Sequence, residues 1–328
     1  MEQRPLMLLS VVVPMYNESE GVNTFHYDIL LPEVLKVAKK SFEIIYVNDG
    51  SKDNTLNLLT KIAATDKSVK VVNLSRNFGK EIATTAGISV ASGKATIIMD
   101  GDGQHPPTAL GEFLEKWEKG AQVVVGVRET NQKEGVVKKW GSKVFYTIFN
   151  STSGSEIVPR STDFRLIDQV VRTEFLRFTE RQRITRGLID WLGFKREYVT
   201  FHSPARLAGE ASYKTSQLVR LAINSFVSLS LKPLFIFGWM GVVITLLSLA
   251  IGLFIIIEQF ILADPLALNF TGPALLGIFT SFLIGLVLTS QGMIAIYLSH
   301  VHGQTQERPL FVIDPANSIN IDIHASSL

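Results

Sequence analysis

Two long stretches without charge limit what this chain can fold into. No Asp, Glu, Lys or Arg occurs in residues 233–257 or in residues 265–299. A helix needs about 20 apolar residues to span the hydrocarbon core of a bilayer. We therefore expect two transmembrane helices in residues 233–299, at about 233–257 and 273–299. Two helices buried in the core of a soluble domain are the alternative interpretation.

The charges around these stretches predict an orientation. Basic residues flank them on both sides, and the short loop between them has acidic residues but no Lys or Arg. The flanking residues are Arg220, Lys232 and Arg308, and the loop residues are Glu258 and Asp264. Because cytoplasmic segments of membrane proteins carry an excess of Lys and Arg, we expect the loop to be external. A domain at residues 1–214 and a tail at residues 300–328 would then both face the cytosol.

Two further segments suggest contact with the membrane surface. In residues 215–232 the polar side chains fall on one stripe of a helix, which predicts an amphipathic helix at the interface. That stripe consists of Gln217, Arg220, Asn224 and Ser228. Residues 136–149 place lysines around Trp140 and a run of aromatic and aliphatic residues. They suit either a second interfacial helix or an ordinary surface helix packed on the domain.

The first 130 or so residues follow a different pattern. From Leu8 to about Val127, runs rich in Val and Ile alternate with helix-length amphipathic stretches. The expected strands are Ser10–Val13, Phe42–Val47, Val69–Leu74, Ala95–Met99 and Gln122–Val127, and the expected helices lie near 19–38, 53–65, 79–91 and 107–119. This alternation predicts an α/β fold with a mostly parallel, Rossmann-like sheet covered by helices on both faces. Ligands of such folds bind beyond the carboxyl ends of the strands, so polar residues there are the candidate site.

The composition excludes several classes of function. The net charge is +2, which gives no electrostatic case for a nucleic-acid partner. No Cys is present, so disulfide frameworks, thiol catalysis and Cys-ligated zinc are excluded. The apolar stretch Leu6–Val13 ends at Pro14 without a small-residue cleavage site, so we interpret it as a first strand rather than a signal peptide.

Acidic and amide residues follow three of the expected strands. The first strand ends in "VVVPMYNE" (11–18), the second in "VNDGSKDNT" (47–55) and the fourth in "MDGDGQHPP" (99–107). In the last of these, Asp100 and Asp102 need a cation or a neighbouring positive group if both are ionised in one cleft. Oxygen ligands without His or Cys suit Mg²⁺ or Mn²⁺. A solvated turn is the alternative, because Asp and Gly are common turn residues.

Further motifs extend this pattern over nearly the whole chain. They are "NLSRNFGKEIATTAGI", "STDFRL", "RGLIDWLGF" and "RLAGEASYK". In order and spacing the motifs resemble the glycosyltransferase family 2 enzymes of GT-A fold. They are similar in particular to the polyprenyl-phosphate branch, typified by dolichyl-phosphate mannose synthases and bacterial bactoprenol glucosyltransferases. One departure is Gly103, where relatives often carry Leu, and it leaves the acidic residues in place.

The resemblance implies roles for the polar strand ends. The residues implied to hold the nucleoside of a nucleotide diphosphate sugar are Pro14, Tyr16, Glu18 and Asp49. Asp100 and Asp102 would bind the diphosphate of that sugar donor through a divalent cation, either Mg²⁺ or Mn²⁺. Gln104 would be a third ligand of this metal.

The resemblance also implies catalytic and acceptor-binding residues. Asp163 lies where the family has an acidic residue near the reactive carbon of the sugar, either as a base or as an orienting group. Because guanidinium groups match phosphate oxygens two at a time, Arg128 and Arg206 are further catalytic candidates that would bind the lipid phosphate and the leaving diphosphate. The other implied ligands of the lipid phosphate are Lys138, Ser142 and Lys214. Relatives often have Arg in place of Lys138, and an ammonium group cannot form the same fork.

The implied reaction is an inverting, metal-dependent transfer of a sugar to polyprenyl (undecaprenyl or bactoprenyl) phosphate at the cytosolic face of the inner (plasma) membrane. UDP-glucose is the first expectation for the donor, and mannose or a modified arabinose would use the same motifs. The acceptor is already anionic, so Asp163 is expected mainly to orient it. A catalytically silent, membrane-anchored scaffold that binds nucleotide sugars is the alternative of another class. We also expect homo-oligomers, because one hairpin buries little membrane surface.

Overall fold

The computed structural model describes residues 9–38, 41–129, 160–181, 183–204, 272–306 and 308–321, with isolated positions between 243 and 257. By their contacts the residues form two compact units. Met1–Tyr213 and Arg308–Leu328 make up the first, and Lys214–Glu307 make up the second. The first unit contains the sheet and every candidate site residue that the structure describes.

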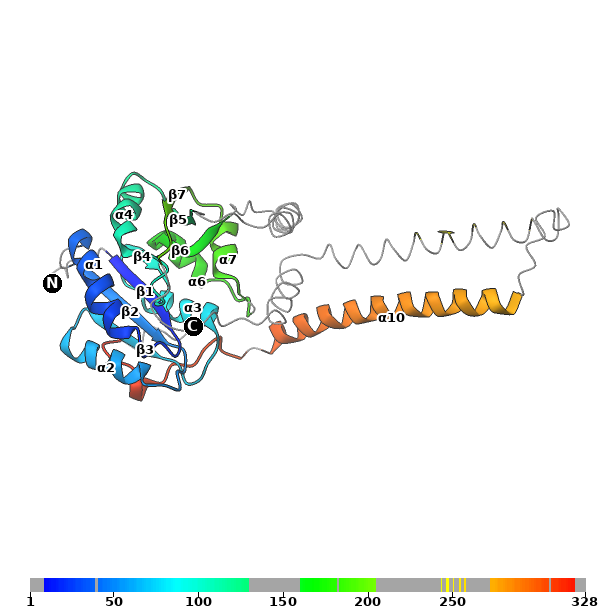
Figure 1. The fold of residues 1–328 in the computed structure, drawn as a ribbon, viewed down its shortest axis with the longest axis horizontal. Coiled ribbons are helices and arrows are strands. Elements are labelled where there is room, and N and C mark those ends of the chain that lie inside the picture. Colours follow the sequence, from blue (N-terminus) through cyan, green and yellow to red (C-terminus); the bar gives the residue numbers. More distant parts are fainter. Residues whose placement is uncertain are drawn as a thin grey trace. The chain divides into compact units, whose positions relative to one another are not determined.

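The first unit is built on a seven-stranded sheet in the order β3-β2-β1-β4-β6-β5-β7 (Figure 1). The strands are β1 (Leu9–Met15), β2 (Phe42–Asn48), β3 (Val69–Asn73), β4 (Ala95–Ile98), β5 (Val123–Arg128), β6 (Ser161–Asp168) and β7 (Arg196–Phe201). β1 pairs in parallel with β2 and β4, and β2 with β3, so the carboxyl ends of these four strands share one edge. β6 is antiparallel to both β4 and β5, while β5 and β7 are parallel.

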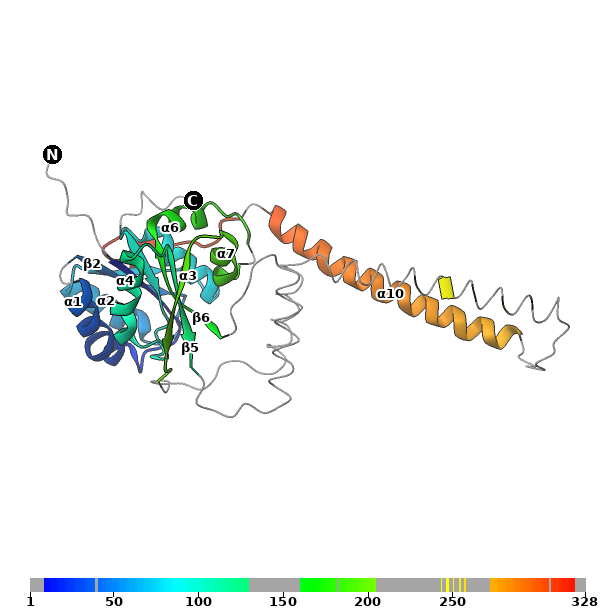
Figure 2. The same cartoon turned by 90° about the horizontal axis from the view of Figure 1, so that it is seen from above.

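Helices cover both faces of this sheet (Figures 1 and 2). One face packs against a π-helical segment η1 (Thr24–Leu30), α1 (Leu31–Ala38), α2 (Thr55–Thr65) and α4 (Leu110–Glu118), which follows the 3₁₀ turn η2 (Pro107–Ala109). The other face packs against α3 (Lys80–Val90), α6 (Gln169–Leu176) and α7 (Thr185–Trp191). Because both faces are covered, every residue of β2 and β4 is buried.

The sequence predicted most of this arrangement. All five expected strands and four expected helices occur, and the mostly parallel sheet with helices on both faces is confirmed. The helix expected near 19–38 begins as η1 and continues as α1. One difference from the expected parallel order is β6, which lies antiparallel between β4 and β5.

A buried ion pair joins β6 to α7. Nη1 and Nη2 of Arg165 lie 2.7 and 3.1 Å from the two carboxylate oxygens of Asp190. Arg165 is only 1% exposed and Asp190 only 6% exposed, so the guanidinium of Arg165 depends on Asp190 for compensation, while Asp190 also lies 3.5 Å from Nη1 of Arg196. Nε of Arg165 also donates to the carbonyl of Thr162 at 3.1 Å, which fixes the start of β6.

Removing one partner of this pair should leave a buried charge. We expect Asp190→Ala to lower the free energy of unfolding by about 3–5 kcal/mol, the usual cost of breaking a buried pair on one side. As a control, Glu174→Ala breaks the exposed pair with Arg177 and should cost less than about 1 kcal/mol. Urea unfolding followed by tryptophan fluorescence measures both changes, and equal losses in the two variants would contradict this account.

Glu43 is a second buried charge, at the amino ends of the strands. Its carboxylate accepts hydrogen bonds from Oγ of Ser10 at 2.5 Å and the N–H of Ser92 at 2.6 Å, and it pairs with Nζ of Lys70 at 2.5 Å. Burial opposes its ionisation, but the hydrogen bonds from Lys70 and Ser10 hold the pKa of Glu43 below its ordinary value.

This lowered pKa has a consequence for stability in acid. The ionised Glu43 stabilises the fold above its unfolded-state pKa, and this contribution is lost as the pH falls through the lower folded-state pKa. We expect the thermal midpoint of the native protein to fall more steeply between about pH 5 and about pH 3 than that of Glu43→Gln. Calorimetry at a series of pH values checks this, and parallel curves for the two proteins would disprove it.

The second unit contributes one long apolar helix, α10 (Gly272–Thr305). Among the described residues, its segment Phe282–Ser299 is the one stretch long and apolar enough to cross a bilayer, judged by length and composition, with a mean hydropathy of 1.8. It coincides with the second expected transmembrane helix. The other expected membrane segments lie largely outside the described residues: 136–149, 215–232 and 233–257. The two-helix hairpin and the interfacial helices therefore stay predictions.

After α10 the chain returns to the first unit. Residues 308–321 lie beside β3, the edge strand of the sheet, and include the 3₁₀ turn η4 (Pro315–Asn317) (Figure 1). Isolated antiparallel bridges join Val71 to Ile319 and Leu74 to Ile313. Within the expected tail at 300–328, α10 therefore continues to Thr305, and residues 308–321 add to the edge of the sheet.

Candidate active site

The antiparallel pairing of β4 and β6 sets two predicted site residues opposite each other. Ala95 pairs with Asp168, and Ile98 pairs with Arg165. Continuing this register past Ile98 by two residues places Asp100 opposite Asp163. The two carboxylates therefore meet at the carboxyl end of β4 although they are far apart in the sequence.

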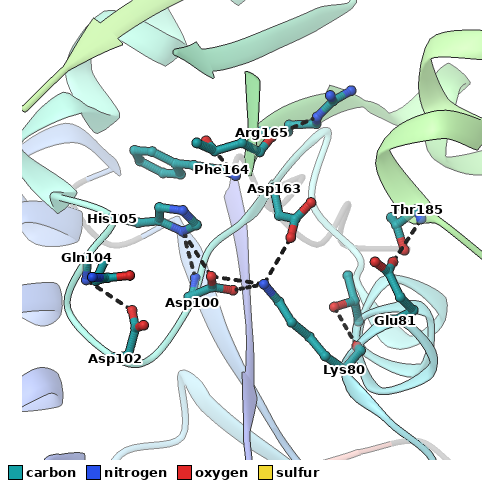
Figure 3. A network of polar contacts seen from close by, with 12 residues as sticks. Lys80, Glu81, Asp100, Asp102, Gln104, His105, Asp163, Phe164, Arg165 and Thr185 are labelled. Atoms are coloured by element: carbon teal, nitrogen blue, oxygen red, sulfur yellow. Dashed lines mark hydrogen bonds and ion pairs between the residues drawn. The ribbon is translucent and has the colours of Figure 1, made fainter. Parts of the chain in front are cut away.

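The ammonium group of Lys80 lies between these carboxylates (Figure 3). Its Nζ is 2.7 Å from Oδ1 of Asp100 and 2.9 Å from Oδ2 of Asp163. Lys80 is the first residue of α3. It follows Gly79, whose φ of 96° lies in the region that favours glycine. The protein itself thus supplies a positive group to Asp100, one of the two acidic residues expected to need it, and to Asp163.

This ion triad of Lys80, Asp100 and Asp163 shifts the ionisation of its members. Burial alone would lower the pKa of Lys80, but the charges of Asp100 and Asp163 raise it. Burial alone would raise the pKa of Asp163, but the charges of Lys80 and Arg186 lower it to about 2. A carboxylate with so low a pKa is a weak proton acceptor at neutral pH, which favours an orienting role for Asp163 over a role as base.

His105 fixes the backbone at Asp100. Its Nδ1 accepts a hydrogen bond from the N–H of Asp100 at 3.0 Å, and its ring stacks on Phe164 with ring centroids 5.1 Å apart (Figure 3). Burial lowers the pKa of His105, so the imidazole is neutral and carries its proton on Nε2. A neutral ring acts here as a hydrogen-bond acceptor that holds the loop after β4.

Asp102 and Gln104 lie on the same loop, away from Lys80 (Figure 3). The N–H of Gln104 donates to Oδ1 of Asp102 at 3.0 Å, and Gly103 between them has a φ of 80°. This turn orients the second carboxylate of the predicted metal site. The glycine conformation also explains why Gly at position 103 is compatible with the loop.

The donor set fits a divalent cation only in part. In the portion of the chain that the structure describes, no three or more His, Cys, Asp or Glu side chains gather where they could hold a metal ion. Mg²⁺ and Mn²⁺ are commonly held by one or two carboxylates and complete their shell with water and phosphate oxygens. Asp100 and Asp102 could supply at most two ligands of such a shell and do not form a closed protein site, so their role as metal ligands stays a prediction.

Pro14 lies within β1, and the loops after β1 and β2 carry the other residues predicted to hold a nucleoside. Tyr16 is 42% exposed, and Pro14 is half-buried beside β2. The N–H of Glu18 donates to Oγ1 of Thr55 at 2.9 Å. Asp53 accepts from the N–H groups of both Thr55, the first residue of α2, and Ser19. The two loops are thus joined by hydrogen bonds at the edge of the sheet where the ion triad lies.

Asp49, the last of the predicted nucleoside ligands, has a structural task. Its side chain is 2% exposed, and its two oxygens accept from the N–H groups of Phe78 at 2.7 Å and Gly79 at 2.9 Å. Burial raises its pKa despite these two donors. Asp49 therefore holds the residues immediately before Lys80, and its part in binding a nucleoside stays a prediction.

A cavity of about 340 Å³, within the size range of small-molecule sites, opens beside Asp163. Three guanidinium groups of described residues line it, and the described residues of its lining are Asp100, His105, Arg128, Arg160, Ser161, Thr162, Asp163 and Arg186. Nε of Arg128 is buried and has no hydrogen-bond partner among the described residues. An unsatisfied buried donor costs about 1–3 kcal/mol, and an anion bound in this cavity could satisfy it.

The remaining predicted phosphate ligands are Arg206, Lys138, Ser142 and Lys214, and all four lie outside the described residues. Their roles stay predictions. The structure describes Arg128 and brings it together with Asp163 and Asp100 in the lining of the cavity.

Sequence reasoning missed Lys80, Arg160 and Arg186. Lys80 begins the helix after the third strand. The rule for parallel sheets therefore places it at the same edge as Asp49 and Asp100, and this placement could have identified it from the sequence. Arg160 immediately precedes β6, and Arg186 lies in α7. Neither follows a parallel strand, so only the antiparallel placement of β6 brings them to the cavity.

Comparisons with known proteins agree over most of the chain. The sequence model described as Glycosyl transferase family 2 matches residues 10–175. An uncharacterized glycosyltransferase of Synechocystis sp. is 39% identical over 93% of this chain and 94% of that protein. A bactoprenol glucosyl transferase of Shigella phage SfV is 30% identical over 94% of this chain and 98% of that protein. The crystal structure of mannosyl-3-phosphoglycerate synthase from Rubrobacter xylanophilus has a TM-score of 0.49 and 18% identity, covering 66% of this chain and 70% of that chain.

The sheet and the polar groups beyond its strand ends match the α/β class of proteins that bind ligands at the carboxyl edge of a mostly parallel sheet. The chain belongs to glycosyltransferase family 2, and it is a glycosyltransferase.

The ion triad predicts a strong effect of removing the ammonium group. In Lys80→Met the carboxylates of Asp100 and Asp163 lose their shared cation, and we expect kcat for sugar transfer to fall about 100-fold or more. The matched control is Lys119→Met, which removes an ammonium from the exposed pair with Glu115 and should leave kcat within about twofold. Steady-state transfer assays compare the two variants, and a Lys80→Met enzyme with native kcat would show that the triad has no catalytic role.

Proposed function

We propose that this glycosyltransferase moves a hexose from a nucleotide diphosphate sugar to polyprenyl phosphate at the cytosolic face of a bacterial plasma membrane. The observation that carries the proposal is the cavity of three arginines directly beside the acidic ion triad. Relatives named bactoprenol glucosyl transferase, 30–31% identical over most of both chains, support a lipid phosphate as acceptor and glucose as the sugar. UDP-glucose is accordingly the proposed donor.

The arginine cavity suits the anionic acceptor. Arg128, Arg160 and Arg186 offer planar donors that can bind phosphate oxygens in pairs, and Ser161 and Thr162 add hydroxyl groups. Asp163 lies in the same lining, so a phosphate in the cavity would be next to the group proposed to orient it. Arg206, Lys138, Ser142 and Lys214 are proposed to complete the acceptor site.

The chemistry is a single displacement. An oxygen of the acceptor phosphate forms a bond to the anomeric carbon, the bond from that carbon to the diphosphate breaks, and the nucleoside diphosphate leaves with the electron pair. The configuration at the carbon is inverted. No proton has to be removed from an acceptor that is already ionised, which agrees with the low pKa of Asp163.

The donor is proposed to bind along the loops after β1, β2 and β4. Pro14, Tyr16, Glu18 and Asp49 would contact the nucleoside at the ends of β1 and β2. Asp100 and Asp102, with Gln104, would hold a Mg²⁺ or Mn²⁺ ion that neutralises charge on the leaving diphosphate. Lys80 lies next to the same position and supplies positive charge from the protein itself.

Membrane attachment is proposed to hold the enzyme where its acceptor is. The apolar segment of α10 is long enough to cross the bilayer, and a second helix at about 233–257 would complete the hairpin. A catalytic unit held at the membrane meets a lipid headgroup in a local encounter rather than a search in solution. Association into homo-oligomers is part of the same proposal.

Two alternatives are distinguished by the product. The same reaction with mannose or a modified arabinose would give a lipid product of different mass or sugar composition. A catalytically silent scaffold would bind the nucleotide sugar and give no lipid product with any donor. The intact ion triad and arginine cavity favour turnover over the scaffold.

Purified full-length protein, UDP-glucose, Mg²⁺ or Mn²⁺ and undecaprenyl phosphate provide the test. We expect a lipid product whose mass is that of undecaprenyl phosphate plus one hexose. Asp102→Ala should lower its rate of formation by about 100-fold or more, because several kcal/mol of electrostatic stabilisation are lost. The control Asp28→Ala removes an exposed carboxylate from η1 and should have native activity.

The assay can also contradict the proposal. Binding of nucleotide sugars without lipid product, over a panel of donors, would support the scaffold instead. Undiminished transfer by Asp102→Ala would remove the proposed metal role of that carboxylate.

A further inference from the structure

The free edge of β3 is covered by the chain's own carboxyl-terminal segment. The N–H groups of Val71, Asn73 and Ser75, which alternate along this edge, donate to the carbonyl of Ile319, Oγ of Ser318 and the carbonyl of Val312 at 2.9–3.0 Å. In return, the N–H groups of Ile319 and Asp314 donate to the carbonyls of Val71 and Asn73 at 2.9 and 2.8 Å. An edge strand exposes such groups unless another segment pairs with them, so residues 308–321 complete the sheet.

The segment is also fixed by its own contacts. Oδ1 of Asp314 accepts from the N–H of Ala316 and caps η4, and Oγ of Ser318 donates to the carbonyl of Asp314. Asn320, with a φ of 59°, donates from its side chain to the carbonyls of Ala63 and Val69. The apolar side chains of residues 308–321 pack on the hydrophobic cores of both faces of the sheet. Ile319 packs on the core beneath α1, α2 and α4, and the core beneath α3 contacts Phe311, Ile313 and Ile321.

A chain of buried amides leads from this segment toward the active site. Nδ2 of Asn73 donates to Oδ2 of Asp314 at 3.2 Å, and Oδ1 of Asn73 accepts from Nδ2 of Asn48 at 2.7 Å. Asn48 is 1% exposed and immediately precedes Asp49. The orientation of Asn73 is therefore determined by an acceptor in the tail on one side and a donor in β2 on the other.

The loop between β3 and α3 is held at both ends. At its start, the N–H of Leu74 donates to the carbonyl of Asn48, and that of Ser75 donates to Val312 in the tail. At its end, the carboxylate of Asp49 accepts from Phe78 and Gly79. In its middle, the loop lies against Gly50 so closely that a Cβ there would be 2.4 Å from the carbonyl carbon of Arg76. The next residue after this loop is Lys80.

We propose that residues 308–321 are a clamp that positions the 75–79 loop, and through it Lys80, against Asp100 and Asp163, with Asp314 as the positioning residue. The clamp would make the geometry of the active site depend on the segment that follows α10 directly in the sequence. The expected effect on sugar transfer rests on the proposed function, whereas the contact by which residues 308–321 hold the loop does not.

Asp314→Asn is designed to break the contact with Asn73 and to keep the local turn. Asn caps a helical turn as well as Asp does, so the bond to the N–H of Ala316 is kept. The amide that replaces Oδ2 is a donor, however, and it faces the donor groups of Asn73 and Asn317. Asn73 could accept from this amide only by turning over, and its bond to Asn48 would then be kept only if the amide of Asn48, whose Oδ1 has no hydrogen-bond partner among the described residues, turned over as well.

Asp168→Asn is the matched control. Oδ1 of Asp168 caps α6 by accepting from the N–H of Val170, and Oδ2 accepts from Nε1 of Trp117 at 2.7 Å. Asp168→Asn therefore makes the same chemical change as Asp314→Asn: the helix cap is kept, and an oxygen that accepts a hydrogen bond is replaced by a donor. Asp168 pairs with Ala95 at the amino end of β4, on the opposite edge of the sheet from the ion triad.

The first measurement is hydrogen–deuterium exchange of the full-length protein. In Asp314→Asn we expect amide exchange in residues 74–80 to rise about tenfold or more, while exchange in residues 123–128 is unchanged. Asp168→Asn should leave exchange in residues 74–80 at the native rate. Native exchange in Asp314→Asn, or an equal rise in both variants, would overturn the clamp, and this result needs no substrate.

The second measurement is the rate of sugar transfer. We expect kcat of Asp314→Asn to fall about tenfold with the KM for undecaprenyl phosphate unchanged, because a small displacement of Lys80 misplaces a charged group. Asp168→Asn should keep the native kcat. Faster exchange with native kcat would overturn the positioning role. If the native protein transfers no sugar at all, the proposed function fails, and the exchange measurement still decides whether the tail holds the loop.

Discussion

Because β4 and β6 run antiparallel, Asp100 and Asp163 meet beyond the end of β4, and the ammonium of Lys80 keeps their charges together. Two unit charges about 4 Å apart interact by about 4 kcal/mol at an effective dielectric constant of 20. The side chain of Lys80 is 42% exposed, so solvent screens this attraction and its net contribution to stability is smaller. Much of the surrounding structure serves these three residues: His105 holds Asp100, the buried ion pair of Arg165 holds the start of β6, and Asp49 holds the loop before Lys80.

The same arrangement would let the two proposed anionic substrates, a nucleotide sugar and a lipid phosphate, meet in one site. A sugar diphosphate and a lipid phosphate repel each other unless each charge is compensated separately. The acidic loop after β4 can compensate the diphosphate through a cation, and the arginine cavity can compensate the acceptor directly. Asp163 lies on the border of the two regions and interacts with both Lys80 and Arg186. An ionised carboxylate there can orient both partners without taking up a proton.

The sequence was a good guide to the parallel half of the fold and a poor one to the antiparallel half. β1 to β5 are runs of Val and Ile bounded by turn residues, and the loops after β1, β2 and β4 follow from the rule for parallel sheets. β6 contains a buried Arg165, whose partner Asp190 lies on a distant helix, so its burial is invisible in a pattern of apolar residues. Lys80, Arg160 and Arg186 depend on this strand or on the start of α3 for their placement. Residues 308–321 pair with β3 although they lie far from it in the sequence, and no local pattern could show that pairing.

A double-mutant cycle between Lys80 and Asp163 tests the central claim most directly, with kcat for sugar transfer as the measured quantity. If the ammonium acts through the carboxylate, Lys80→Met combined with Asp163→Asn should be about as active as the weaker single variant, because either change already breaks the pair. Losses that multiply in the double variant would mean that the two groups act independently, and the ion triad would then not be the organising interaction of this site.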